Sequence, residues 1–226
     1  MTLFKDAWRQ HAVPVLVMAT IALPVATVGA ESSNDDPHAH HKQMMRQQAA
    51  ASDNLTDIVL SDAVLITQYG AEVSLRSGVV GDRIVVIDFV YTTCTTVCPV
   101  LSAIFTQVQK KLNDRLGGEV VMVSLSVDPS RDTPARLRSY STKLGAGDGW
   151  LWLTGRKQTV DEVLGDLGAY TPNFEDHPSM VLVGDGQTGK WARFLGFPSA
   201  QQIVKKVDEF SAARETKRAH VATREK

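Results

Sequence analysis

Apolar and polar positions follow two distinct patterns along this chain. Residues 84–90 and 119–127 are almost continuously apolar, which is typical of strands covered on both faces of a sheet. Between them, apolar residues recur at helical spacing from Pro99 until Gly117 and Gly118 end the pattern. A buried strand, a helix and a second buried strand predict a parallel pair joined by a crossover helix.

The rest of the pattern completes an α/β domain. Apolar runs interrupted by turn residues predict two hairpins, and helical periodicity predicts three further helices. We expect the hairpins at 63–75 and 180–194, a short strand at 151–153, and the helices from 133 or 134 to 144, over 158–167 and after the capping residue Ser199. This order predicts an α/β fold, a thioredoxin-like three-layer sandwich with an N-terminal β-hairpin extension and an insertion around 128–167.

The N-terminal part of the chain predicts export. Lys5 and Arg9 precede an uncharged apolar stretch that ends in small residues, so residues 1–30 are interpreted as a signal peptide. Residues 12–30 are almost long enough to span a membrane, which makes a retained N-terminal anchor the alternative to cleavage. We therefore expect a periplasmic or otherwise exported protein, tethered to the inner membrane if residues 12–30 are retained.

The predicted domain boundaries follow from composition. Residues 31–54 are polar and lack aromatic side chains, as in a flexible linker, and this linker contains His and Met. The folded domain is expected at 55–215, followed by a C-terminal tail at 216–226. The formal net charge is −1, and the basic residues of the tail alternate with glutamates, so nucleic acid is excluded as an expected partner.

The two cysteines of the chain concentrate its candidate chemistry. Cys94 and Cys98 lie in residues 91–99, Tyr-Thr-Thr-Cys-Thr-Thr-Val-Cys-Pro, at the start of a predicted helix whose N-terminus favours a thiolate. In an oxidising compartment such a pair forms a disulfide, cycles between dithiol and disulfide, or binds a metal ion. Zinc is disfavoured because no second cysteine pair exists, whereas copper(I) needs only two thiolates and an imidazole.

Histidines supply the other candidate ligands. His177 precedes the predicted strand at 180–183, and its spacing fits a third metal ligand and an ordinary surface-loop histidine equally well. A second group lies in the linker and forms either a copper-collecting arm or a solvated tether. Its members are His38, His40, His41, Met44 and Met45.

Several segments in this order resemble the Sco/SenC family, thioredoxin-like copper proteins associated with the assembly of cytochrome c oxidase. They are the cysteine motif at 90–99, Ser-Val-Asp-Pro-Ser-Arg-Asp-Thr-Pro at 126–134, Leu-Thr-Gly at 153–155, Asp-His at 176–177 and Asp-Gly at 185–186. The resemblance implies a copper-binding domain in which Cys94, Cys98 and His177 hold a copper ion, Cu(I) or Cu(II). It also implies a partner, cytochrome c oxidase subunit II or another periplasmic copper or thiol protein.

One departure from the family pattern lies between the cysteines. Thr95 and Thr96 stand where many members carry Pro-Asp, so an acidic group beside the site is missing. Asp128 or Asp132 is a candidate for supplying outer contacts to the site instead, although a turn or helix cap is the simpler role for either residue.

Two further positions resemble thioredoxins themselves. Asp88 lies in the strand before the cysteines, where burial would raise its pKa and let it exchange protons with a thiol; the alternative is an aspartate at a partly wet edge. Pro178 follows His177 at the place of the thioredoxin cis-proline, so we expect a cis peptide bond there.

Three functions are consistent with these residues. The first is a copper-binding metallochaperone that delivers copper to the dinuclear copper site of the oxidase, or reduces the thiols of that site. The second is an exported thiol-disulfide oxidoreductase that uses Cys94 and Cys98 with Asp88 as proton carrier. The third is a redox-sensing or structural domain with an inert disulfide, and a peroxidase ranks last because its cysteines are arranged differently.

Overall fold

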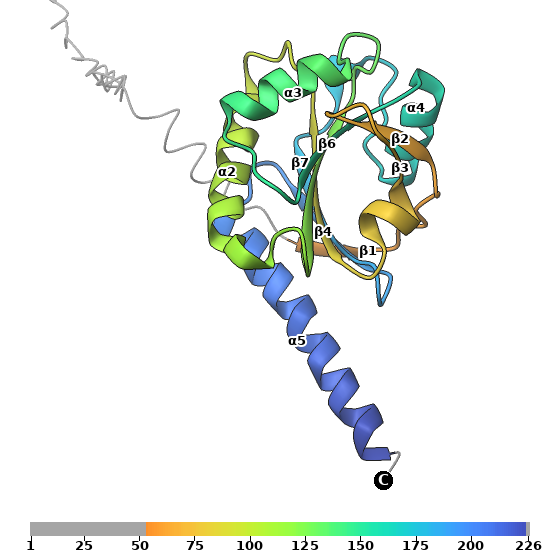
Figure 1. The fold of residues 1–226 in the computed structure, drawn as a ribbon, viewed down its shortest axis with the longest axis vertical. Coiled ribbons are helices and arrows are strands. Elements are labelled where there is room, and N and C mark those ends of the chain that lie inside the picture. The colour runs from red at the N-terminus through yellow and green to blue at the C-terminus, as the bar shows by residue number, and fades with distance from the viewer. Residues whose placement is uncertain (1–52, 225–226) are drawn as a thin grey trace, which may run out of the picture. The chain divides into compact units, whose positions relative to one another are not determined.

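The apolar segment at 84–90 forms β4 (Ile84–Val90), near the middle of an eight-stranded sheet in the computed structural model, which describes residues 53–224 (Figure 1). The strand order is β1-β8-β7-β4-β5-β6-β2-β3. The other strands are β1 (Asp53–Thr56), β2 (Val64–Thr67), β3 (Glu72–Ser74), β5 (Val120–Ser126), β6 (Trp150–Thr154), β7 (Met180–Asp185) and β8 (Lys190–Leu195). The helical elements are η1 (Leu75–Val80), α2 (Val97–Leu112), η2 (Asn113–Arg115), α3 (Pro134–Lys143), α4 (Lys157–Asp166), η3 (Phe174–Asp176) and α5 (Ala200–Arg224).

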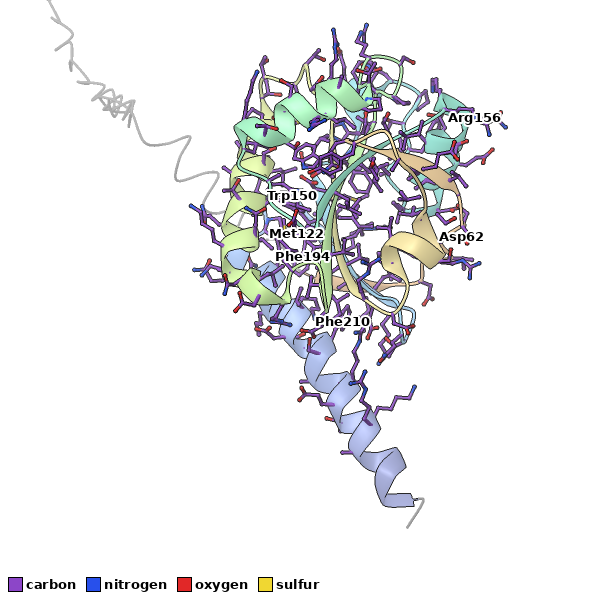
Figure 2. All side chains as sticks on the ribbon, in the orientation of Figure 1. Asp62, Met122, Trp150, Arg156, Phe194 and Phe210 are labelled. Atoms are coloured by element: carbon purple, nitrogen blue, oxygen red, sulfur yellow. The ribbon has the colours of Figure 1, made fainter. Side chains whose placement is uncertain are left out.

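Side chains of β4 alternate between two cores, one on each face of the sheet. Val85 and Ile87 pack in the core beneath η1 and α4, whereas Ile84 and Val86 pack in the core beneath α2 and α5. Figure 1 shows these helices on opposite sides of the sheet, and Figure 2 shows Met122, Trp150 and Phe194 on the α2 side. All seven residues of β4 are buried, as a strand covered on both faces requires. The predicted three-layer sandwich is confirmed.

The strand pairing confirms the predicted topology. β4 runs parallel to β5 and β5 runs parallel to β6, with α2 and α3 as the crossover helices. β7 runs antiparallel to β4 on its other side and forms a hairpin with β8. The N-terminal hairpin of β2 and β3 joins the sheet through β6.

The structure adds elements that the sequence pattern did not predict. β1 pairs antiparallel with β8 although its sequence, Asp-Asn-Leu-Thr, contains two residues that are rare in strands. η1 is a π-helix, and α5 continues to Arg224 through residues assigned above to the tail. None of the described helices is both long and apolar enough to cross a membrane. The predicted signal or anchor at 1–30 and the His/Met group of the linker lie outside the described residues.

A buried ion pair attaches α5 to the hairpin. Arg214 Nη2 lies 2.5 Å from Asp185 Oδ1, and Arg214 Nε donates to the same oxygen at 3.1 Å. Burial alone would raise the pKa of Asp185, but the guanidinium outweighs burial and lowers it. The oxygen also accepts hydrogen bonds from the backbone N–H groups of Gln187 and Thr188, so the pair joins the helix to the turn between β7 and β8.

We expect Gly184→Ala to destabilise the fold. Gly184 pairs with Trp191, and a Cβ at Gly184 would lie 2.5 Å from two atoms of the indole ring. Overpacking of this kind should lower the free energy of unfolding by about 1–3 kcal/mol, measured by urea denaturation.

Gly165→Ala is the matched control. Gly165 lies within α4, and a Cβ there would meet nothing within 4 Å outside its own helix. This variant should be as stable as the wild type, or more stable by up to about 1 kcal/mol. Equal stabilities of Gly184→Ala and the wild type would contradict the close packing of Trp191.

Candidate metal centre

The two thiols lie where β4 ends and α2 begins. Cys94 belongs to the connecting loop and Cys98 to the first turn of α2, which starts at Val97, two residues before Pro99. The N-cap residue, Thr96, makes no side-chain hydrogen bond to the helix; instead the backbone N–H of Cys98 donates to the Cys94 sulfur at 3.3 Å. A sulfur atom therefore accepts one of the free donors of the helix N-terminus, an arrangement that favours its anionic form.

The thiols are both reduced and buried, but they differ in acidity. Cys94 is 7% exposed and Cys98 is 0% exposed. Burial opposes ionisation of Cys94, yet hydrogen bonds from the Cys98 thiol and from the backbone of Cys98 and Thr96 outweigh it and lower its pKa to about 7. Burial, followed by the hydrogen bond to Cys94, raises the pKa of Cys98. The pair therefore combines one thiol that ionises readily with one thiol that retains its proton.

His177 presents an imidazole nitrogen with no partner. Its Nδ1 lies 2.8 Å from the carbonyl oxygen of Phe174, which can only accept, so the ring proton resides on Nδ1. Nε2 is buried without a hydrogen-bond partner, and the residue is 7% exposed. Burial lowers the pKa of His177 and outweighs the opposing effect of the Phe174 and Phe89 carbonyl groups, which keeps the ring neutral. A neutral imidazole oriented by a backbone carbonyl, with a free Nε2 lone pair, is suited to binding a metal ion.

Tyr91 connects the thiols to His177, and the sequence analysis did not single it out. Its ring meets His177 edge-on with the centroids 5.7 Å apart, and meets Phe174 in the same way at 5.2 Å. The interaction of its hydroxyl with the Cys94 thiolate, together with burial, raises the pKa of Tyr91 to about 12. An aromatic residue immediately after a buried strand and directly before the cysteine loop is the sequence signal that could have identified it.

The predicted ligands are only partly brought together. Within residues 53–224, no three His, Cys, Asp or Glu side chains lie close enough together to hold a metal ion. The thiols contact each other, and the side chain of Tyr91 contacts both Cys94 and His177. Two soft sulfur atoms and a free imidazole nitrogen are nevertheless the donor set that copper prefers. The set of Cys94, Cys98 and His177 remains a prediction.

Asp88 lies beneath α2, on the same face of β4 as Ile84 and Val86. It is fully buried, and burial raises its pKa to about 7. One carboxylate oxygen accepts from the Ser124 hydroxyl at 2.6 Å, and Ser124 in turn accepts from the Trp150 indole at 3.0 Å. The other oxygen, Oδ2, has no hydrogen-bond partner. The interpretation of Asp88 as an aspartate at a wet edge is therefore wrong, and the buried-acid interpretation is supported.

The expected cis peptide bond before Pro178 is wrong. No peptide bond among the described residues is cis. His177 has φ −60° and ψ 140°, an extended conformation, which proline imposes on its predecessor whichever isomer forms. The position of Pro178 in the sequence therefore did not determine the isomer, and trans is the ordinary state.

The two acidic candidates of the 126–134 motif lie in the turn before α3. Asp128 is buried and pairs with Arg131 at 3.0 Å. Asp132 accepts hydrogen bonds from Thr92 and Ser126, whereas the cap of α3 is provided by Thr133. In none of these interactions does the carboxylate of Asp128 or Asp132 contact Cys94, Cys98 or His177.

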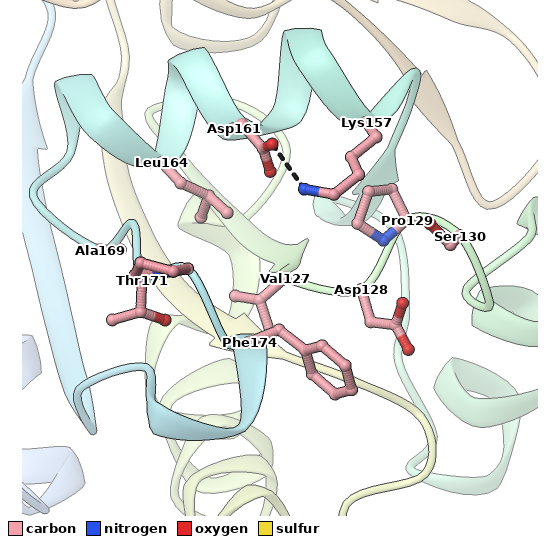
Figure 3. A pocket seen from close by; sticks show the side chains of 11 residues that line it. Val127, Asp128, Pro129, Ser130, Lys157, Asp161, Leu164, Ala169, Thr171 and Phe174 are labelled. Atoms are coloured by element: carbon pink, nitrogen blue, oxygen red, sulfur yellow. Dashed lines mark hydrogen bonds and ion pairs between the residues drawn. The ribbon is translucent and has the colours of Figure 1, made fainter.

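A small cavity of about 60 Å³ lies behind Phe174 (Figure 3). The loop at 127–130 forms one wall, and α4 with residues 169–174 forms the other. Asp161 and Lys157 form an ion pair across one turn of α4 at 2.5 Å. None of the three predicted ligands lines this cavity.

The fold and the site together define a thioredoxin-like α/β protein with a buried, asymmetric dithiol and a nearby imidazole. The sequence profile of the SCO1/SenC family matches residues 53–212. The chain therefore belongs to the SCO1/SenC family.

Individual relatives agree with this assignment. The SCO1 protein homolog of Bacillus subtilis (strain 168) is 37% identical over 96 residues, which cover 42% of this chain and 48% of the relative, so the match spans about half of that protein. The structure of BsSco, a Sco-family cytochrome c oxidase assembly protein with a disulfide switch, has a TM-score of 0.60 and 27% identity, covering 70% of this chain and 96% of BsSco. Copper-bound yeast Sco1 has a TM-score of 0.57 at 21% identity, covers 70% of this chain and 94% of its own, and shows similarity of fold.

We expect iodoacetamide to modify Cys94 before Cys98 in the reduced protein. The rate at Cys94 should rise with pH through a midpoint of about 7, because only the thiolate reacts. Cys98 should react slowly at every pH below 9, since its thiol is buried and keeps its proton. Mass spectrometry of alkylated peptides assigns each rate.

Tyr91→Phe provides the control. The variant keeps the aromatic ring against His177 and Phe174 but removes the hydroxyl, so the midpoint at Cys94 should move upward. The lowered pKa of Cys94 would be contradicted if the wild-type alkylation midpoint lay near the free-thiol pKa of about 8.5 and were the same in Tyr91→Phe.

Proposed function

We propose that this protein is an exported copper-binding metallochaperone that delivers copper to the dinuclear site of cytochrome c oxidase, or reduces the thiols of that site. The observation that carries the proposal is the buried, unpartnered Nε2 of His177, whose ring packs against Tyr91, the residue that also interacts with the more acidic thiol, Cys94. A buried nitrogen without a hydrogen bond costs about 1–3 kcal/mol, a cost that a bound metal ion would offset. Copper bound to the related yeast Sco1 supports the same assignment.

The proposed ligands are the two thiolates and His177 Nε2, with copper as cargo. Cys94 is already largely ionised above pH 7, whereas Cys98 must release its proton on binding. Copper uptake should therefore be weaker at low pH. The Phe174 carbonyl holds the imidazole with Nε2 free, and closure of the site requires this nitrogen to approach the sulfurs past Tyr91.

We expect the reduced protein to bind one copper ion per chain under anaerobic titration with copper(I) or copper(II). The copper(II) form should show a sulfur-to-copper charge-transfer band. His177→Ala should lose this band and weaken affinity at least about 10-fold, because one of three ligands is removed. Cys94→Ser and Cys98→Ser should each abolish retention of the metal.

His220→Ala is the matched control, since His220 is the only other histidine after the linker group. It should keep the wild-type band and affinity. Deletion of residues 38–45 should leave the stoichiometry unchanged if the linker group is only a tether. A wild-type protein without band or retained copper would overturn the proposal.

A thiol-disulfide oxidoreductase is the second candidate, favoured by the buried Asp88. Its negative charge contributes to the raised pKa of Cys98, so the two groups sense each other electrostatically. A carboxyl group with a pKa of about 7 is suited to accept the proton of Cys98 when a disulfide is exchanged. One dithiol can serve both functions, depending on whether copper is bound.

For this candidate we expect Asp88→Asn to slow exchange with a small dithiol by about 100-fold while leaving copper affinity unchanged. His177→Ala should weaken copper affinity and leave the rate of dithiol exchange unchanged. The raised pKa of Asp88 means that its favourable contribution to stability is present below the unfolded pKa of about 3.8 and is lost as pH rises through about 7. Asp88→Asn should therefore flatten the decline of stability between pH 4 and pH 7, measured by urea denaturation. Unaltered exchange in Asp88→Asn would eliminate Asp88 as proton carrier.

A further inference from the structure

Both carboxylate oxygens of Asp132 accept hydrogen bonds, from Thr92 in the segment that carries the thiols and from Ser126 at the end of β5. Asp132 is 1% exposed. Its Oδ1 accepts from the Thr92 hydroxyl at 2.6 Å and from the Thr92 backbone N–H at 3.1 Å, and its Oδ2 accepts from the Ser126 hydroxyl at 2.7 Å. A buried carboxylate is costly unless hydrogen bonds satisfy it, so these donors define the position of Thr92 tightly.

Thr92 connects the Asp132 carboxylate to the loop that carries Cys94. It lies between Tyr91 and Cys94, and the Cys94 N–H donates to the Tyr91 carbonyl at 3.1 Å across it. Fixing Thr92 to the end of β5 therefore fixes the turn that directs the Cys94 sulfur to the start of α2. The cap of α3 does not need the Asp132 side chain, because Thr133 accepts from the Arg136 N–H.

Arg131, the residue before Asp132, contacts the loop that carries His177. Its guanidinium lies over the Phe174 ring, 5.5 Å from the centroid, and donates to Asp128 Oδ2 at 3.0 Å. Phe174 in turn accepts the hydrogen bond from His177 Nδ1 that leaves Nε2 free. Arg131 thus acts on the segment that orients the imidazole.

We propose that residues 128–132 position the two parts of the site relative to each other. Asp132 positions the segment that carries Cys94, and Arg131 positions the loop that carries His177. We call residues 128–132 the bracket. Asp132 and Arg131 are both positioning residues, since neither contacts a predicted ligand directly. The role of Arg131 rests on the proposed copper function. The role of Asp132 concerns the thiol segment itself and is testable without copper.

The first test is Asp132→Asn in the copper-free, reduced protein. Asparagine replaces one acceptor oxygen with an amide nitrogen that cannot accept from Thr92 or Ser126. Hydrogen–deuterium exchange of residues 91–98 should accelerate about 10-fold, as expected for loss of a hydrogen bond to a charged group. Gly184→Ala, which weakens the opposite end of the sheet, is the control for global destabilisation. Equal exchange of 91–98 in the two variants, compared at matched unfolding free energy, would overturn the role of Asp132.

The second test uses copper as the probe. Asp132→Asn and Arg131→Met should each lower copper affinity about 10-fold and shift the copper(II) charge-transfer band, because the ligands are less well oriented. Arg136→Met, an exposed arginine on α3, should change neither quantity. Arg131→Met should leave the exchange of 91–98 unchanged, and adding Phe174→Leu to it should cost little more, because the two residues act together.

The outcomes separate the bracket from the proposed function. If wild-type protein binds no copper, the metallochaperone proposal and the role of Arg131 fail, while the exchange experiment still decides the role of Asp132. If copper binds and Arg131→Met has the wild-type affinity and band, Arg131 is not a positioning residue. Wild-type exchange in Asp132→Asn would overturn the thiol half of the bracket in either case.

Discussion

The hydrogen bond from the Cys98 N–H to the Cys94 sulfur is the interaction on which the site depends. It joins the end of the central strand to the start of α2 and occupies a helix donor that a side-chain cap would otherwise satisfy. Because β4 is held between β5 and β7, the loop that carries Cys94 begins from a rigid position. The same hydrogen bond favours the thiolate of Cys94 over that of Cys98. Local backbone geometry thus makes two chemically identical side chains different.

Several buried side-chain polar atoms of the described residues have no hydrogen-bond partner, and two of them carry chemistry that suits this site. Asp88 Oδ2 is beneath α2 on the sheet, and His177 Nε2 is in the loop before β7. Unpaired buried groups are rare in folded proteins because each one costs free energy, and they concentrate at sites with a function. Here the carboxyl group suits proton exchange with a thiol and the imidazole suits metal binding. The structure therefore has the groups for thiol chemistry and for copper chemistry around a single dithiol.

Much of the fold was predictable because its signals are local. Residues 84–90 are apolar throughout since both faces of the strand are covered, and the amphipathic helices show their period directly. β1 was not predictable, because an edge strand with the sequence Asp-Asn-Leu-Thr forms through pairing with β8 rather than through its own propensity. The π-helix η1 is likewise defined by where Leu75 and Val79 must reach the core. The bond before Pro178 is trans, the ordinary state, so the likeness of this position to the thioredoxin cis-proline did not predict the isomer.

By itself, the sequence determined the reactive pair and its place at a strand-to-helix junction, because these residues are adjacent along the chain. The order of several separate motifs between residues 90 and 186 indicated the family. Only the tertiary structure decided which thiol ionises, which nitrogen of His177 is free, and that Asp88 is fully buried. It also revealed Tyr91 between Cys94 and His177, and Asp132 and Arg131 in contact with opposite halves of the site. These properties depend on burial and on contacts between residues distant in sequence, which exist only once the sheet and its helices have assembled.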